Sequence, residues 1–162
     1  MTVDTLELIK ANFELIKGEP EVNNVFPLVG NGKELLAADG PTVLADAKKI
    51  GVTPSDFKVK ILDPKQIALS VWNYKQRQDK IQSMLDDPER LKKCPPILIH
   101  EKKNGSYEVI DGGHRRTAAA RLDLPIKTLC VNDKAYQALD NSGWRDTKMY
   151  RLANYLFGKG LI

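Results

Sequence analysis

The stretch "EVIDGGHRRTAAARLDLPIKTLCV", residues 108–131, contains the signals of a strand, a tight turn, a helix and a second strand in direct succession. Apolar residues lead into Asp111, two glycines follow, and the alanine-rich run from about His114 favours a helix. Leu124-Pro125 ends that helix, and "IKTLCV" is an apolar run typical of a buried strand.

The turn between strand and helix has the composition of an anion-binding site. A helix that begins there directs its first N–H groups and the positive end of its dipole to one point. Glycine at 112 and 113 would let a phosphate approach the main chain closely. Arg115 and Arg116 in the first turn oppose the helix dipole, and a bound phosphate would give them a reason to be there. A plain turn with an aspartate cap and two solvated arginines explains the same residues.

The segments around this stretch predict an α+β protein with helices packed on a small mixed sheet. Residues 56–63 alternate in polarity like a half-buried strand, and residues 74–87 form a short amphipathic pattern that stops before a proline. Two apolar runs, 97–100 and 107–110, are joined by Asn104-Gly105, the strongest short hairpin signal. A turn of helix is expected within residues 136–143, and residues 144–157 predict a closing amphipathic helix.

Residues 1–55 differ from the rest and predict a helical N-terminal extension to a domain of residues 56–162. Helices are expected at about 3–17, 33–38 and 41–50, and they are candidates for binding a partner protein. This segment has five lysines, no arginine and eight acidic residues, a net charge of −3. The remaining 107 residues have twenty basic and thirteen acidic residues, a net charge of +7. That asymmetry favours a polyanionic ligand, although basic surfaces also serve solubility.

Composition excludes several classes of protein. With 42% hydrophobic and 28% charged residues, the 162-residue chain has the balance of a globular protein. No apolar run approaches the roughly 20 residues that a membrane helix needs, so no membrane association is expected. The acidic, amphipathic start lacks the features of a secretory signal, and two widely spaced cysteines make no disulfide framework. We therefore expect a cytoplasmic protein.

Over about residues 56–131, the order of these segments resembles the ParB/sulfiredoxin superfamily. The turn is similar to the Asp-Gly-His-His-Arg motif of the free-serine kinases in that superfamily, with Asp111, Gly112, His114 and Arg115 identical. In ParB-type partition proteins the motif is Gly-Glu-Arg-Arg, and Gly113 stands at its glutamate. Upstream, Asn73 and Gln76 match the Asn and Gln of a second motif of those proteins, with Arg77 one place early.

The resemblance implies a nucleotide-binding protein that carries out ATP-dependent phosphotransfer or nucleotide hydrolysis, with ATP or another nucleoside triphosphate and Mg²⁺ as cofactors. It implies Asp111 as a catalytic or metal-positioning acid. Asp63 is the second candidate acid, although it equally suits the start of an Asp-Pro turn. The candidate phosphate and nucleotide ligands are Gly112, Gly113, His114, Arg115, Arg116, Gln76 and Arg77.

Two other functions are consistent with the sequence. Arg145, Lys148 and Arg151 lie near one side of the closing helix and could follow a DNA backbone, which would suit a DNA-binding or nuclease module. A solvated helix face explains them as well. The chain could also be an inactive adaptor or inhibitor that acts through its N-terminal helices. A sulfinic reductase is disfavoured, because the motif cysteine of sulfiredoxin falls on Gly113.

Overall fold

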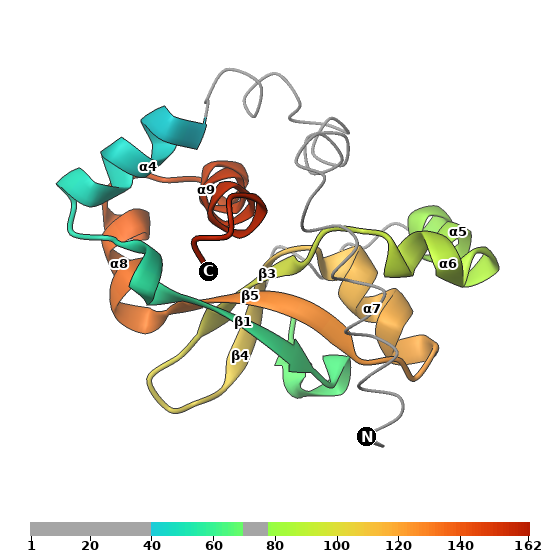
Figure 1. Ribbon diagram of the computed structural model, residues 1–162. Coiled ribbons are helices and arrows are strands. Elements are labelled where there is room, and N and C mark those ends of the chain that lie inside the picture. Colours follow the sequence, from blue (N-terminus) through green and yellow to red (C-terminus); the bar gives the residue numbers. More distant parts are fainter. Residues whose placement is uncertain (1–39, 70–77) are drawn as a thin grey trace.

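The computed structural model describes residues 40–69 and 78–162 (Figure 1). The helices expected at 3–17 and 33–38, together with Asn73, Gln76 and Arg77, lie outside the described residues. The described helices are α4 (Gly40–Lys49), α5 (Gln78–Asp86), α6 (Pro88–Lys92), α7 (Gly113–Arg121), α8 (Asp133–Asn141) and α9 (Asp146–Gly158), with 3₁₀ turns η2 (Pro54–Asp56) and η3 (Pro64–Gln66).

The described strands form one mixed sheet in the order β1-β5-β3-β4-β2. They are β1 (Phe57–Leu62), β2 (Ile67–Ala68), β3 (Ile97–Glu101), β4 (Tyr107–Asp111) and β5 (Ile126–Asn132). β1 is antiparallel to β5, β5 is parallel to β3, β3 is antiparallel to β4, and β4 is parallel to β2. The predicted α+β class with a small mixed sheet is confirmed.

Helices cover both faces of the sheet, so the central strands are buried on both sides. α4, α8 and α9 lie on one side in Figure 1, and α5, α6 and α7 lie on the other. Along β3, Ile97 and Ile99 belong to the core under α7, whereas Leu98 belongs to the core under α9. This alternation follows from the two-residue period of a strand. The fold therefore has two apolar cores separated by the sheet.

The hairpin and the helix after it form as the sequence predicts. Gly105 closes the loop between β3 and β4 with φ of +84°, and the N–H of Lys102 donates to the carbonyl of Ser106 at 2.9 Å. α7 begins at Gly113, one residue before the expected start. Its Ala118 and Ala119 are buried against the sheet, because small side chains let the helix pack closely on β3.

The part of the predicted N-terminal extension that the structure describes contributes to the core of the predicted domain. α4 packs on α9, and Val43 and Ala47 are buried with α9 residues such as Leu152 and Leu156. Its bounds agree with the helix expected at 41–50 to within one residue.

Three elements differ from expectation. α8 is a full helix that starts at Asp133, because the side chain of Asn132 accepts a hydrogen bond from the N–H of Ala135 at 2.8 Å and caps it. α6 and the two-residue strand β2 were not expected at all. Neither is long enough to show a hydrophobic period, and β2 forms through pairing with β4. Within the described residues, no helix is both long and apolar enough to cross a membrane.

Candidate functional site

The candidate site is the turn between β4 and α7, where Gly112 has a backbone conformation that other residues rarely adopt. Its φ is +106°, and a Cβ added there would lie 2.4 Å from Cγ2 of Ile97. Glycine is therefore required both by the left-handed backbone and by the contact with β3. The N–H of Arg116 donates to the carbonyl of Gly112 at 2.9 Å, which closes the first turn of α7 directly behind Asp111.

Asp111 is a half-buried carboxylate whose proton affinity is unusual. Burial raises its pKa to about 6, although Arg115 nearby and the N–H of Gly112 act in the opposite direction. Asp146, in the first turn of α9, raises the pKa of Asp111 further by like-charge repulsion. A carboxyl group with this pKa exchanges a proton near neutral pH, which is a property of general acids and bases.

Arg115 points into the protein and makes internal hydrogen bonds. It is 7% exposed, its Nη1 donates to the carbonyl of Pro95, and its Nη2 donates to the hydroxyl of Tyr150 at 2.7 Å. The hydroxyl of Tyr150 in turn donates to the carbonyl of Pro96 at 3.0 Å. These contacts occupy the guanidinium in the described structure, and phosphate binding by Arg115 stays a prediction.

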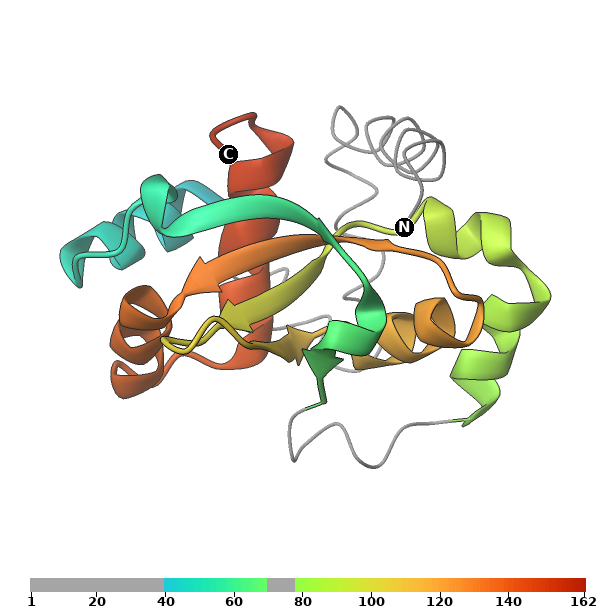
Figure 2. The ribbon, with the colours of Figure 1, turned by 90° about the horizontal axis from the view of Figure 1, so that it is seen from below.

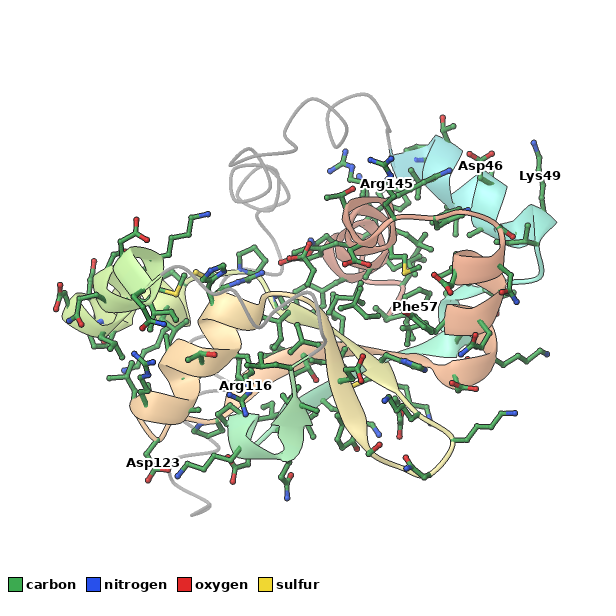
Figure 3. The ribbon with its side chains drawn as sticks, turned by 180° about the vertical axis from the view of Figure 1, so that it is seen from behind. Asp46, Lys49, Phe57, Arg116, Asp123 and Arg145 are labelled. Carbon is green, nitrogen blue, oxygen red and sulfur yellow. The ribbon has the colours of Figure 1, made fainter. Side chains whose placement is uncertain are left out.

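Arg116, unlike Arg115, points toward the edge strand β2 of the sheet. Figure 3 shows it between α7 and the segment of η3 and β2, and its Nε donates to the carbonyl of Ile67 at 2.9 Å. Its charge lies near Asp63, which partly offsets the effect of burial on the pKa of Arg116. His114, at the start of α7, is half-buried. Arg116 and His114 therefore remain candidates for contact with an anion at this turn.

Asp63 begins an Asp-Pro turn, which is one of the two roles that the sequence predicts for it. Its side chain caps η3 by accepting from the N–H of Lys65 at 3.0 Å. Its charged neighbours include Arg116 and Lys65, whereas Asp111 interacts with Arg115 and Asp146. The two candidate acids thus have different electrostatic partners, and a catalytic role for Asp63 stays a prediction.

The described residues contain no group of three or more His, Cys, Asp or Glu side chains that could hold a metal ion. Mg²⁺ does not require such a group, since it commonly binds through one or two carboxylates together with substrate phosphates and water. Metal binding by Asp111 therefore stays a prediction.

The three basic residues predicted to bind DNA on and beside α9 differ in their exposure and in their neighbours. Lys148 lies over the ring of Trp144, with Nζ 4.2 Å from the ring centroid and 3.8 Å from Oδ2 of Asp46 on α4. Arg145 is exposed at the N-cap of α9 and appears in Figure 3 on the same side as Asp46. Arg151 is half-buried. Asp46 therefore places a negative charge within this predicted DNA-binding surface, and DNA binding stays a prediction.

Two residues of the site, Tyr150 and Asp146, were missed by sequence reasoning. In the sequence, Tyr150 is one residue of an amphipathic closing helix, and nothing marks it as different from the apolar residues around it. Asp146 is an acid in the first turn of a helix, where acids are common because they stabilise the helix dipole. No sequence signal connects either residue to Asp111, because the connection is made by packing between α9 and β4.

A second polar cluster, built around the buried His100, lies at the other end of β3. Nε2 of His100 and Oδ1 of Asp133 are 2.8 Å apart, and the ring of His100 stacks on Tyr136 with centroids 3.9 Å apart. The hydrogen bond with His100 lowers the pKa of Asp133. This cluster connects β3 with the first turns of α8.

Comparisons with known proteins match no family model and no curated protein. Among solved structures, the chain is similar to sulfiredoxin from Arabidopsis thaliana, with 22% identity and a TM-score of 0.39. The match covers 51% of this chain and 97% of that one.

Proposed function

We propose that this protein binds a nucleoside triphosphate at the start of α7 and uses Asp111 in phosphoryl transfer or nucleotide hydrolysis. The observation that carries the proposal is the position of Asp111, a carboxyl group with a pKa of about 6 set directly before a left-handed glycine and a helix N-terminus. A proton acceptor and a site of positive potential are thereby adjacent.

In this proposal the phosphates contact the half-buried side chains of His114 and Arg116, whereas Gly113 itself is buried. The N–H groups at the start of α7 point out along its axis and favour an anion there. Arg116 donates through Nε to the carbonyl of Ile67. In this proposal its two terminal nitrogens, Nη1 and Nη2, donate to the phosphate.

Asp111 has one of two roles in the reaction. As a base, its carboxylate accepts the proton of the attacking hydroxyl group or water. As a ligand, its carboxylate would hold Mg²⁺ beside the phosphates, and the ion would supply positive charge there. Both roles need the ionised carboxylate, so the rate is expected to rise with pH through about 6 in either case.

Nucleotide binding is tested by the melting temperature of the full chain with ATP, ADP, CTP or GTP and Mg²⁺. A ligand at 100 times its Kd stabilises the folded state by about 2.7 kcal/mol, so at least one nucleotide is expected to raise the melting temperature. No rise with any of the four at millimolar concentration would overturn the proposal.

Matched variants of α7 locate the binding site. Arg116→Gln is expected to reduce the nucleotide-dependent rise, whereas Arg121→Gln, which removes the same charge from the exposed last turn, should preserve it. Asp111→Asn should retain binding and lose the release of phosphate. Full turnover in Asp111→Asn would exclude the catalytic role.

A further inference from the structure

β1 is an edge strand, and its outer side pairs with no other strand in the described part of the chain. Figure 2 shows it as the outermost strand of the sheet, with β5 beside it. All six residues of β1 pair with β5 in one continuous register, whereas β2, at the opposite edge, has only two residues. A regular edge strand is a template for pairing with a further strand, because its outer main-chain groups lack partners.

A hydrogen bond to β5 shows which main-chain groups of β1 point outward. Oγ1 of Thr128 donates to the carbonyl of Lys60 at 2.8 Å, and Thr128 is the residue opposite Lys60 on β5. The carbonyl of Lys60 therefore points toward β5. Successive residues of a strand direct their N–H and C=O groups to opposite sides, so those of Val59 and Ile61 point away from β5. An added strand can pair with these two residues without any change in the pairing of β1 with β5.

The side chains along this edge are positively charged on one face of the sheet and apolar on the other. Val59 packs against the core under α9, and Ile61, two residues on, lies on the same face. Lys58 and Lys60 lie on the opposite face, where Lys58 is exposed and Nζ of Lys60 donates to Oε1 of Glu101 at 2.9 Å. An added strand would therefore meet lysines on one face and half-buried apolar side chains on the other.

A second copy of this chain does not suit the edge. Two β1 strands related by a two-fold axis run antiparallel, and their outward residues, Phe57, Val59 and Ile61, must then face one another. Every register that joins two or more of these residues places Lys58 or Lys60 opposite a lysine of the second copy. Like charges directly opposite each other destabilise a pair of strands, so the edge favours a partner with a different sequence.

We propose that the outer edge of β1 is a docking site for an extended segment of another protein, with acidic residues opposite Lys58 and Lys60 and apolar residues opposite Val59 and Ile61. In strand addition of this kind, main-chain hydrogen bonds give affinity and the alternating side chains give specificity. An acid opposite a lysine stabilises the pair of strands that a second lysine would destabilise. Such docking adds a protein-binding surface to the nucleotide site and does not rest on the proposed function.

The test uses the full chain and two fluorescent octapeptides, one of alternating glutamate and valine and one of alternating lysine and valine. Fluorescence anisotropy is expected to show that the acidic peptide binds, that added salt weakens its binding, and that the basic peptide binds more weakly or not at all. No binding of the acidic peptide at millimolar concentration, or equal affinity for the two peptides, would overturn the proposal.

A proline in β1 separates docking at the edge from the stability of the fold. Because the N–H of Val59 points outward, Val59→Pro removes no hydrogen bond to β5, and its ring obstructs a strand added at the edge. The variant is expected to fold and to lose the binding of the acidic peptide. Unchanged affinity in folded Val59→Pro would exclude docking at this edge.

A charge reversal keeps the proposal falsifiable if Val59→Pro does not fold. Lys58→Glu replaces attraction by repulsion, so the affinity for the acidic peptide is expected to fall by roughly 2- to 30-fold. Lys93→Glu makes the same change of charge at an exposed residue just after α6 and should leave the affinity unchanged. Wild-type affinity in Lys58→Glu, or an equal loss in Lys93→Glu, would show that Lys58 does not select the partner.

Amide hydrogen exchange reports the state of the edge directly. In the chain without peptide, the amides of Val59 and Ile61 are expected to exchange faster than those of Lys58 and Lys60, which point toward β5. The acidic peptide should slow the exchange of Val59 and Ile61. Slow exchange of these two amides without peptide would mean that a second copy or another segment of this chain already covers the edge, and docking of a foreign strand there would be ruled out.

Discussion

Replacing Gly112 by alanine tests how the turn before α7 is built. The new Cβ would meet Cγ2 of Ile97 at 2.4 Å and Cβ of Ile97 at 2.6 Å, far inside van der Waals contact. A φ of +106° adds backbone strain of about 1 to 3 kcal/mol for a residue other than glycine. Overpacking against a buried side chain adds about 1 to 3 kcal/mol. Gly112→Ala is therefore expected to cost about 2 to 6 kcal/mol of the free energy of unfolding.

Gly105→Ala is the matched control, because Gly105 also has a positive φ, +84°, but a Cβ there would meet nothing within 4 Å. It should show the backbone cost alone. Urea denaturation followed by circular dichroism measures both free energies of unfolding with the same baseline. If Gly112→Ala is no more destabilising than Gly105→Ala, the contact with Ile97 does not constrain the turn, and our explanation of the glycine is wrong.

Three further predictions concern charge. Folding raises the pKa of Asp111 to about 6, so between about pH 4 and 6 the folded state binds more protons than the unfolded state. The free energy of unfolding should therefore fall as the pH rises through that range. Chemical denaturation at several pH values should show this fall, and Asp111→Asn should remove it. Asp133 should change the free energy of unfolding with pH in the opposite direction, because its hydrogen bond with His100 lowers the pKa of Asp133. This bond should stabilise the folded state above about pH 4 and cease to do so at lower pH. His100→Phe should abolish this part of the acid dependence in the same assay. The alternative DNA-associated function predicts that fluorescence anisotropy detects duplex binding that weakens steeply with salt and weakens further in Arg145→Gln; absent or salt-independent binding would count against it.

The fold class and most of the elements could be predicted from the sequence, because their signals are local. The alternation in residues 57–62, the Asn104-Gly105 hairpin and the alanine-rich helix each depend on neighbours within a few positions. The same holds for the turn at Asp111, where a strand, two glycines and a helix follow one another. α8 was underestimated because Asn132 both ends β5 and caps the helix.

The candidate site shows where local information ends. From the sequence, Arg115 and Arg116 are adjacent basic residues in one helical turn, and both are predicted to bind phosphate. In the structure they point to different parts of the protein, because the partners of Arg115 lie 20 and 35 residues away and the partner of Arg116 lies 49 residues away. No propensity or period encodes such distant pairs.

The sequence by itself therefore determined the order of most of the elements and the position of the turn that joins β4 to α7, since these follow from backbone preferences and hydrophobic spacing. Only the tertiary structure decided that Gly112 must fit against Ile97, that Arg115 is buried against Tyr150, and that Asp146 lies near Asp111. The physical reason is that burial and pKa depend on which surfaces are packed together, and here the packing of α9 on the sheet brings together residues that are far apart in the chain.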